Sequence, residues 1–342
     1  MASQETRILD EVITSRRAML VGGGAALAAL AMPAMAHAAS TVTTFSDADI
    51  LNFALNLEYL EANFYYLAAF GTNISTGNPL YPSGAMLQGI SGVGTQGTVT
   101  VKASPKVPFT SLAVASYAVE TAIEEGKHVN FLRTALGSAA VAQPQIDLMT
   151  SFNTLASAAG IGSTFDPFAS DANFLVGAYI FEDVGVTAYH GAAPLISTTS
   201  TGKTYLAAAA GILAVEAYHA GLVRTSINAI DAANGNTALQ TLTQKISATR
   251  YALSKAAAPS SGTGSGAASA TDDIGVGTQM VSLAGGANVS ASTIVDADQT
   301  NVIAFSRTTT QVLNIVTGGG ATTSGTKASG VFFPSGLNGL IT

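Results

Sequence analysis

Two short segments of the chain combine metal-binding residue types at a spacing that suits a helix. Glu125 and His128 stand three residues apart, and Glu216 and His219 repeat this spacing further along the chain. Because three residues turn a helix by roughly 300°, the two side chains of each pair return to one helical face, one turn apart. A carboxylate and an imidazole on one face form half of a metal site, and such ligands suit iron, manganese and, less selectively, zinc.

The similarity between the two segments extends beyond these four residues. Both follow the pattern Glu-x2-His-x4-Arg-Thr, which places Arg133 and Arg224 at matching positions. A single Glu-x-x-His pair on a helix is common and is usually a solvated pair or a cap, whereas two copies with matched flanks favour a built site. We expect both arginines to point away from the ligand face and to form ion pairs at the ends of a helical bundle.

Two further glutamates share a second spacing. Glu58 is followed after seven residues by Tyr65, and Glu182 by Tyr189, which again places each pair on one helical face. The chain therefore runs Glu, Glu-x-x-His, Glu, Glu-x-x-His, the ligand set of carboxylate di-metal four-helix bundles. We expect both tyrosines to lie beside the metals as hydrogen-bond donors or radical-quenching residues, with simple packing as the alternative. The predicted metal ligands are Glu58, Glu125, His128, Glu182, Glu216 and His219.

Other glutamates near these positions are less suited to the site. Glu61 lies three residues after Glu58 and shares its face, so it is either an additional ligand or a neighbour of the ligands. Glu124 has Val215 as its counterpart in the second copy, so we assign it no ligand role. The same reasoning excludes Glu120 as a ligand.

The surroundings of the predicted ligands also favour a metal site. Glu182 follows the apolar segment 174–181, so its carboxylate is expected to be buried, and a buried charge is costly unless it is paired or bound to a cation. All seven glutamates after residue 38 fall in stretches that read as long helices, and none follows residue 257. His190 is expected at the polar surface or beside the ligands, without binding metal itself.

The composition excludes several classes of protein. With 48% hydrophobic and only 10% charged residues, the chain is too apolar for a disordered protein. The net charge is −7 and no basic cluster is present, so nucleic acid is not an expected partner. The absence of cysteine excludes disulfides, thiolate metal sites and thiol catalysis.

Residues 1–38 resemble a bacterial export signal. Ser15, Arg16 and Arg17 begin a twin-arginine pattern, an apolar run follows, and the segment 36–38 fits a small-x-small cleavage site. The alternative, an N-terminal membrane anchor, is disfavoured because the apolar run is shorter than the ~20 residues that a span needs. We therefore expect a periplasmic or extracellular protein whose mature form has no stable membrane span.

The hydrophobic periodicity predicts four bundle helices and a fifth amphipathic helix. Ser46 is the expected N-cap of the first helix, and Gly71 is expected to end it. The predicted spans are 46–70, 110–136, 171–190, 203–232 and 237–256.

The segments outside these helices divide the chain. Residues 72–108 read as a long Gly/Ser/Thr-rich loop that could include a small hairpin near 98–102, and a further helical turn is expected near 144–158. A Ser/Gly-rich linker at 258–270 leads from the bundle into a mostly irregular C-terminal extension, in which 299–317 contains enough apolar residues for a short docked helix. The predicted domains are thus the signal (1–38), the bundle (39–257), and the linker with its extension (258–342).

Three stretches of the chain resemble a known family. The segments 53–65 and 181–189 and the closing stretch 332–339 are similar to the ferritin-like proteins grouped with plant and bacterial desiccation-related proteins. The resemblance implies an all-α, ferritin-like four-helix bundle. It also implies di-metal ligands at the six positions above, as in ferritins, rubrerythrins and manganese catalases.

The resulting hypothesis is an exported ferritin-like protein with two divalent metal ions, iron or manganese. We expect it to carry out redox chemistry with dioxygen or peroxide as part of stress protection. The alternative is a non-enzymatic desiccation- or stress-associated structural protein with a structural or vestigial metal site. Iron storage in a shell is disfavoured, because the long loops and the extension would obstruct cage packing. The sequence leaves open whether the protein forms a homo-oligomer.

Overall fold

The computed structural model describes residues 45–75, 79–80, 85–257, 273–282, 285–298, 301–320 and 327–342. The predicted export signal (1–38) and the predicted linker (258–270) lie outside the described residues, so both stay predictions.

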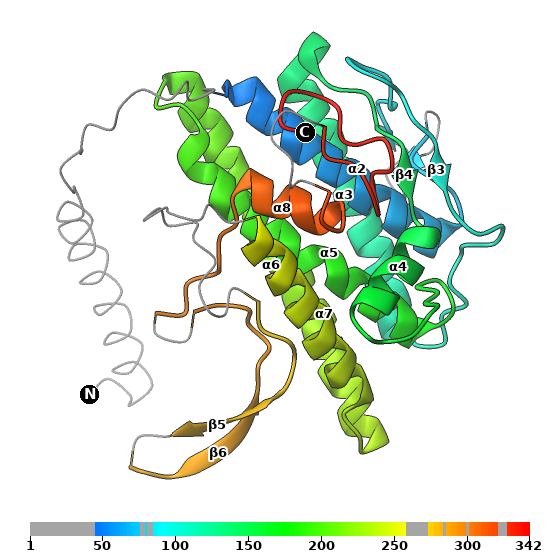
Figure 1. Cartoon of the computed structure of the whole chain (residues 1–342), viewed down its shortest axis with the longest axis vertical. Helices are drawn as coiled ribbons and strands as arrows, with labels where there is room; N and C mark the ends of the chain where they lie inside the picture. The colour runs from blue at the N-terminus through cyan, green and yellow to red at the C-terminus, as the bar shows by residue number, and fades with distance from the viewer. Residues whose placement is uncertain are drawn as a thin grey trace, which may run out of the picture. The chain divides into compact units, whose positions relative to one another are not determined.

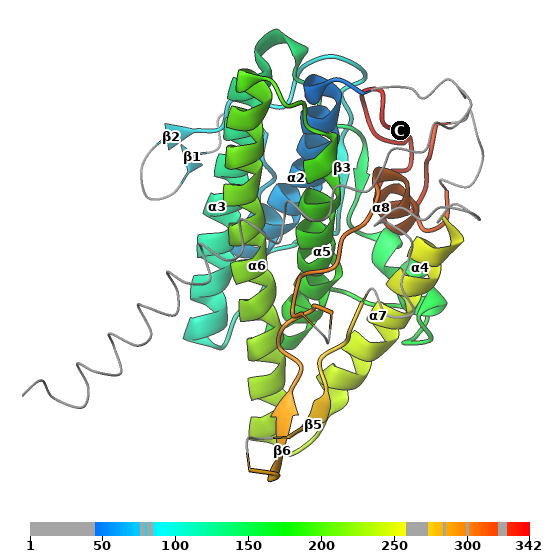
Figure 2. The same ribbon diagram turned by 90° about the vertical axis from the view of Figure 1, so that its left-hand side faces the viewer.

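Four long helices make up the centre of the fold. α2 packs against α3, α5 packs against α6, and the two pairs lie side by side (Figures 1 and 2). The bounds are Asp47–Phe70 (α2), Leu112–Leu136 (α3), Asp171–Ala192 (α5) and Ser200–Asn234 (α6). The predicted all-α four-helix bundle is confirmed, and each helix starts and ends within a few residues of its predicted span.

The helix ends follow from local chemistry. The Ser46 side chain accepts a hydrogen bond from the backbone N–H of Asp49, and the Asp49 side chain accepts one from the Ser46 N–H, which forms a capping box. Gly71 ends α2 at φ 77°, a left-handed conformation that glycine adopts without a Cβ penalty. Ser170 caps α5 in the same manner through the N–H of Asn173. These caps fix where the ligand-bearing helices begin and end.

Three shorter or outer helices flank this bundle. α7 packs against α5, α6 and α8, which agrees with the predicted fifth amphipathic helix. α8 lies within the segment 299–317 for which a docked helix was expected, and α4 corresponds to the expected turn near 144–158. Their bounds are Thr150–Ala158 (α4), Ala238–Ala256 (α7) and Thr309–Val316 (α8).

Short strands join distant loops. β1 and β2 form a small antiparallel hairpin in the predicted loop, whereas β3 pairs in parallel with β4, a segment that follows α3. The segment 98–102 therefore pairs with a distant segment and forms no hairpin of its own. The extension also contains an antiparallel hairpin, β5–β6, which the sequence did not indicate. The bounds are Pro79–Leu80 (β1), Ala85–Met86 (β2), Val99–Thr100 (β3), Ile146–Asp147 (β4), Thr278–Ser282 (β5) and Asn288–Ser292 (β6).

The C-terminal stretch is part of the core. The Phe332 ring lies 4.9 Å from the Phe181 ring and 5.3 Å from the Phe152 ring, measured between centroids. Asn56 of α2 accepts a hydrogen bond from the backbone N–H of Asn338 and donates one to its carbonyl, at 3.0 and 2.8 Å. The closing residues thus complete the packing around α2 and α5.

Among the described helices, α6 is long and apolar enough to cross a membrane, a test that the core helix of a soluble protein also passes. Part of its outward face is exposed, including Leu206 and Tyr218. The same helix carries Glu216 and His219 toward the interior, where they meet residues of the other three bundle helices. Because this convergence needs α6 packed in the bundle, we interpret its apolar character as that of a bundle helix.

Candidate metal centre

The six predicted ligands converge in the core of the bundle. α2 and α5 each contribute one glutamate, and α3 and α6 each contribute a Glu-x-x-His pair. Each of these residues is 9% exposed or less. They are Glu58 (α2), Glu125 and His128 (α3), Glu182 (α5), and Glu216 and His219 (α6).

The converging side chains form two groups that share two members. Glu125 and Glu216 belong to both groups, and within each group the ligand atoms lie within 4.8 Å of one another. The remaining members are Glu58 and His128 in the first group and Glu182 and His219 in the second. Glu125 and Glu216 therefore connect the two groups, and each group adds one further glutamate and one histidine of its own.

The distances show how Glu125 serves both groups. Its Oε2 atom lies 3.5 Å from Nδ1 of His128, and its Oε1 atom lies 3.1 Å from Nδ1 of His219. His128 Nδ1 is also 3.3 Å from Glu58 Oε2, and His219 Nδ1 is 3.4 Å from Glu182 Oε2. Each imidazole therefore turns its Nδ1 atom toward the carboxylates of its own group.

Many of these polar atoms are buried without a hydrogen-bond partner. Both carboxylate oxygens of Glu125 and of Glu216, and the Nδ1 atoms of His128 and His219, are in this state. An unsatisfied buried polar atom costs about 1–3 kcal/mol, so a cluster of them indicates a missing binding partner. Carboxylate oxygens with imidazole nitrogens are ligands for divalent iron or manganese, and the residues present fit a pair of such ions.

Burial and the close approach of these side chains shift their pKa values. Burial raises the pKa of Glu58 to about 7, because the nearby His128 offsets only part of the desolvation. Burial alone would lower the pKa of His128, but the facing carboxylates of Glu58 and Glu125 outweigh it and raise the pKa to about 12. Burial and the neighbouring carboxylates raise the pKa of Glu216 well above its usual range. Burial alone would raise the pKa of Glu125, but His128 and His219 outweigh it and hold that pKa well below its usual range. The centre thus combines protonated histidine with both charged and neutral carboxyl groups.

Two tyrosines hold the unshared glutamates in a crosswise arrangement. Tyr65 of α2 donates a hydrogen bond to Oε1 of Glu182 on α5, and Tyr189 of α5 donates one to Oε1 of Glu58 on α2. In both glutamates the other oxygen, Oε2, is left facing the centre. Each tyrosine therefore lies beside the converging residues and fixes the orientation of one carboxylate.

Comparison with known proteins agrees with this geometry. The model of the ferritin-like domain matches residues 46–229, a region that contains all six converging residues. The chain belongs to the ferritin-like domain family. It is similar to the desiccation-related protein PCC13-62 of Craterostigma plantagineum, with 35% identity over 184 residues. That match covers 52% of each protein, so the chain spans about half the length of this curated relative. No solved structure matches the chain.

One residue of this ferritin-like centre was missed by the sequence reasoning. Glu124 of α3 accepts a hydrogen bond from Nε2 of His219 on α6, at 2.7 Å, which directs the Nδ1 atom of that histidine inward. Glu124 belongs to neither ligand group, and comparison with Val215 along the repeat does not indicate this contact between helices. The repeat does carry the signal, because Val215 cannot provide the same contact for His128. The two halves of the centre are therefore unequal.

Glu61 lies beside the centre but belongs to neither ligand group. Burial and the carboxylates of Glu125 and Glu182 raise its pKa well above the usual range. Gly185 of α5 faces it, and a Cβ atom at this glycine would lie 3.5 Å from Glu61 Oε1 and 2.3 Å from Glu216 Oε2. Of the two expected roles of Glu61, the structure favours a position next to the ligands over a role as an additional ligand. The close approach of Glu216 also explains why residue 185 is glycine.

The contacts of Arg133 and Arg224, the two matched arginines, differ from those predicted. Arg133 forms no ion pair that the described residues show, and instead donates hydrogen bonds to the Tyr59 hydroxyl and, at 2.8 Å, to the Ser91 carbonyl. Arg224 does form an ion pair, with Asp183 at 2.9 Å, but both residues are buried in the interior of the fold. The cause is that α7 and the extension cover this part of α5 and α6, which the bundle repeat alone does not indicate.

His190 does not join the ligands. Its Nδ1 atom lies 2.9 Å from the Ala304 carbonyl and 3.2 Å from the Phe305 carbonyl, so it contacts the backbone of the extension at the end of α5.

Proposed function

We propose that this ferritin-like protein is an exported, stress-associated protein that binds two divalent ions, iron or manganese, for redox chemistry on dioxygen or peroxide. The observation that carries the proposal is the pair of buried ligand groups that share Glu125 and Glu216. The likeness to a desiccation-related protein supports the stress association, and the twin-arginine pattern in 1–38 supports export.

The side chains of the centre have separate roles in this proposal. Bound iron or manganese would supply the electrons that reduce the oxidant. Glu125 and Glu216 would hold the two ions together, and each histidine would give one ion an imidazole ligand through Nδ1. Tyr65 and Tyr189 keep the unshared carboxylates aimed at the ions, and this support from surrounding hydrogen bonds is what fixes ligand geometry. The burial of all these groups keeps bulk water from the centre.

The first experiment measures metal content and turnover on the same preparation. The protein is exported, purified without chelator, and its iron and manganese are counted by inductively coupled plasma mass spectrometry. We expect about two ions per chain, as the ligand set of a di-metal bundle implies. Consumption of dioxygen and of hydrogen peroxide is then followed for the iron-loaded and the manganese-loaded protein. Protein that binds neither ion would overturn the proposal, whereas bound ions without oxidant consumption would favour the structural alternative.

Two substitutions test the arrangement of the ligands. Glu216→Gln removes a shared ligand and should deplete both ions, whereas Glu182→Gln removes an unshared ligand and should deplete mainly one. Glu120→Gln is the matched control, because Glu120 is exposed on α3 and outside both ligand groups. Equal metal content in all three variants would contradict the ligand assignment.

A further inference from the structure

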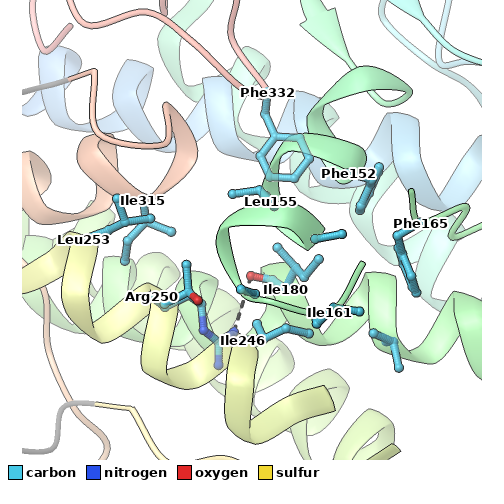
Figure 3. A pocket seen from close by; sticks show the side chains of 14 residues that line it. Phe152, Leu155, Ile161, Phe165, Ile180, Ile246, Arg250, Leu253, Ile315 and Phe332 are labelled. Atoms are coloured by element: carbon cyan, nitrogen blue, oxygen red, sulfur yellow. Dashed lines mark hydrogen bonds between the residues drawn. The ribbon is translucent and has the colours of Figure 1, made fainter. Parts of the chain in front are cut away.

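An apolar cavity lies between the bundle and the outer helices. Side chains from α4, α5, α7 and α8 line it together with Phe332, and it encloses about 40 Å³ (Figure 3). Its inner wall includes the buried residues Ala156, Ile180 and Ile315, while Ala159 at the end of α4 is only half-buried. The cavity therefore extends from near the surface toward the core.

A second, smaller cavity continues from the first toward the metal centre. It encloses about 20 Å³ and is lined by residues of α2, α5 and α8. The two cavities share three lining residues, Ile180, Ile315 and Phe332. Phe332, which Figure 3 shows at one edge of the outer cavity, thus lies between the two spaces.

The inner cavity ends at the candidate metal centre. Glu61 and Gly185 are both part of its wall. A Cβ atom at Gly185 would lie only 2.3 Å from Oε2 of Glu216, one of the two shared glutamates. The wall of the inner cavity at Gly185 is therefore in direct contact with the carboxylate of a shared glutamate.

The chemistry of the walls favours an apolar molecule. In the outer cavity the polar side chains are Thr249 and Arg250, and both make hydrogen bonds to groups elsewhere, although Nε of Arg250 is buried without a partner. Thr249 donates a hydrogen bond to the Lys245 carbonyl, and Arg250 donates to the Tyr179 carbonyl and to carboxylates. Hydrogen peroxide would lose its hydrogen bonds to water on entry, at a cost of a few kcal/mol, whereas dioxygen has none to lose. Apolar cavities of this kind stay dry and bind small apolar molecules such as xenon.

We propose that the two apolar cavities on either side of Phe332 form the entry route by which dioxygen reaches the Glu61 side of the metal centre. This inference rests on the proposed function and narrows it, because it names dioxygen as the oxidant that the structure admits. Phe332 belongs to the C-terminal extension, so the extension contributes a wall of the route.

The first test needs no metal. Crystals of the metal-free protein are pressurised with xenon, and the electron density is compared with that of untreated crystals. We expect xenon in the outer cavity and in the inner cavity beside Gly185. A structure with xenon in neither cavity would overturn the entry route, whatever the metal content of the protein.

The second test follows oxidation of the iron-loaded protein. In this assay dioxygen takes two electrons from two Fe²⁺ ions and two protons from water, and leaves as hydrogen peroxide. Ala159→Leu places a larger side chain at the cavity mouth. When dioxygen is limiting, this substitution should lower the rate of oxidation about tenfold, which corresponds to an increase of ~1.4 kcal/mol in the entry barrier. Ala158→Leu is the matched control, since Ala158 is the exposed neighbouring residue and does not line the cavity.

Parallel measurements separate the outcomes. Circular dichroism melting identifies a variant that fails to fold. Phe332→Leu enlarges the space between the cavities, so this variant should be oxidised by dioxygen faster than the unchanged protein. Oxidation by hydrogen peroxide should be unchanged in Ala159→Leu. An unchanged rate with dioxygen, or an equal loss with both oxidants, would overturn the entry route while leaving the proposed function in place. Xenon in both cavities of a protein that binds no iron would instead overturn the proposed function, and with it the role of the route.

Discussion

At the scale of single residues, the centre contains buried histidines and carboxylates whose protonation metal ions would change. His128 carries a proton in the metal-free protein, because facing carboxylates raise its pKa to about 12. Its Nδ1 atom must lose that proton before it can bind a cation. The pKa of His219 is raised too, since Glu182, Glu124 and Glu125 outweigh the effect of burial. Metal binding and proton release are therefore linked at this centre.

This linkage predicts opposite pH dependences for the two forms of the protein. In the metal-free form, the raised pKa values of His128 and Glu58 contribute stability that is lost as pH rises through those values. Metal binding should release about two protons per centre, so the affinity for Mn²⁺ should rise with pH. Melting temperatures measured between about pH 7 and about pH 9 should fall for metal-free protein and fall less, or rise, for loaded protein. Proton release on Mn²⁺ addition can be measured directly in weakly buffered solution. Parallel curves for the two forms would contradict this prediction.

The unequal halves of the centre lead to a second prediction at this scale. Glu124→Ala removes the partner of His219 Nε2 and should lower metal affinity on the His219 side by about 10–100-fold, the usual effect of losing such a partner. The His128 side should keep its affinity, so a stepwise titration with Mn²⁺ should show one weakened step. Glu120→Ala, one helical turn earlier on α3, is the matched control. Equal weakening of both steps would indicate a general loss of structure instead.

At the scale of the helices, the centre depends on how closely α5 approaches α6. Gly185 makes this approach possible, because any Cβ atom there would meet the Glu216 carboxylate. Gly177, two turns earlier on α5, packs in the same way against Pro167 and Phe64. Glycine lowers the helical propensity of α5 at these positions, but it allows the neighbouring side chains to pack closely against the helix.

We therefore predict that Gly185→Ala displaces a shared ligand. The variant should retain less than half of the bound metal, because Glu216 belongs to both ligand groups. Gly211→Ala on α6 is the matched control: no atom lies within 4 Å of a Cβ atom there, and alanine should stabilise the helix by about 0.5–1 kcal/mol. Metal content and melting temperature measured on both variants test the prediction. Full metal content in Gly185→Ala would show that Glu216 can shift without loss of binding.

The helices and the converging residues could be predicted from the sequence because their signals are local or repeated. Ser46 and Gly71 mark the ends of a helix by their own chemistry, and the duplicated Glu-x-x-His spacing identifies a face. The contact between Glu124 and His219 could not be predicted in this way, because it depends on how near α3 lies to α6. For the same reason, the pairing of β3 with β4 escaped prediction, since neither two-residue strand has a pattern of its own.

At the scale of the whole molecule, a buried ionic network connects the bundle to the extension. Arg250 of α7 lies 3.0 Å from Asp183 of α5 and 2.7 Å from Asp273, which follows the linker. Asp273 also accepts a hydrogen bond from Arg307, which precedes α8, at 2.8 Å. Arg224 of α6 completes the network through Asp183. Five separate parts of the chain therefore depend on one set of buried charges.

Removing one member of this network should destabilise the entire fold. Asp273→Ala leaves Arg250 and Arg307 without a shared carboxylate in the interior, and breaking a buried pair in this way costs about 3–5 kcal/mol. Asp166→Ala is the matched control, because the Lys102–Asp166 pair is 35% and 43% exposed at its two side chains and such pairs contribute about 0–1 kcal/mol. Urea unfolding of both variants gives the two free energies. A similar small loss in both would mean that the extension is held by its apolar contacts, with Phe332 and the Asn56–Asn338 hydrogen bonds as the main attachment. In that case Asn56→Ala, which removes the side chain that makes both of these hydrogen bonds, should detach the extension and expose the cavity behind Phe332 to solvent, whereas Asp273→Ala should not.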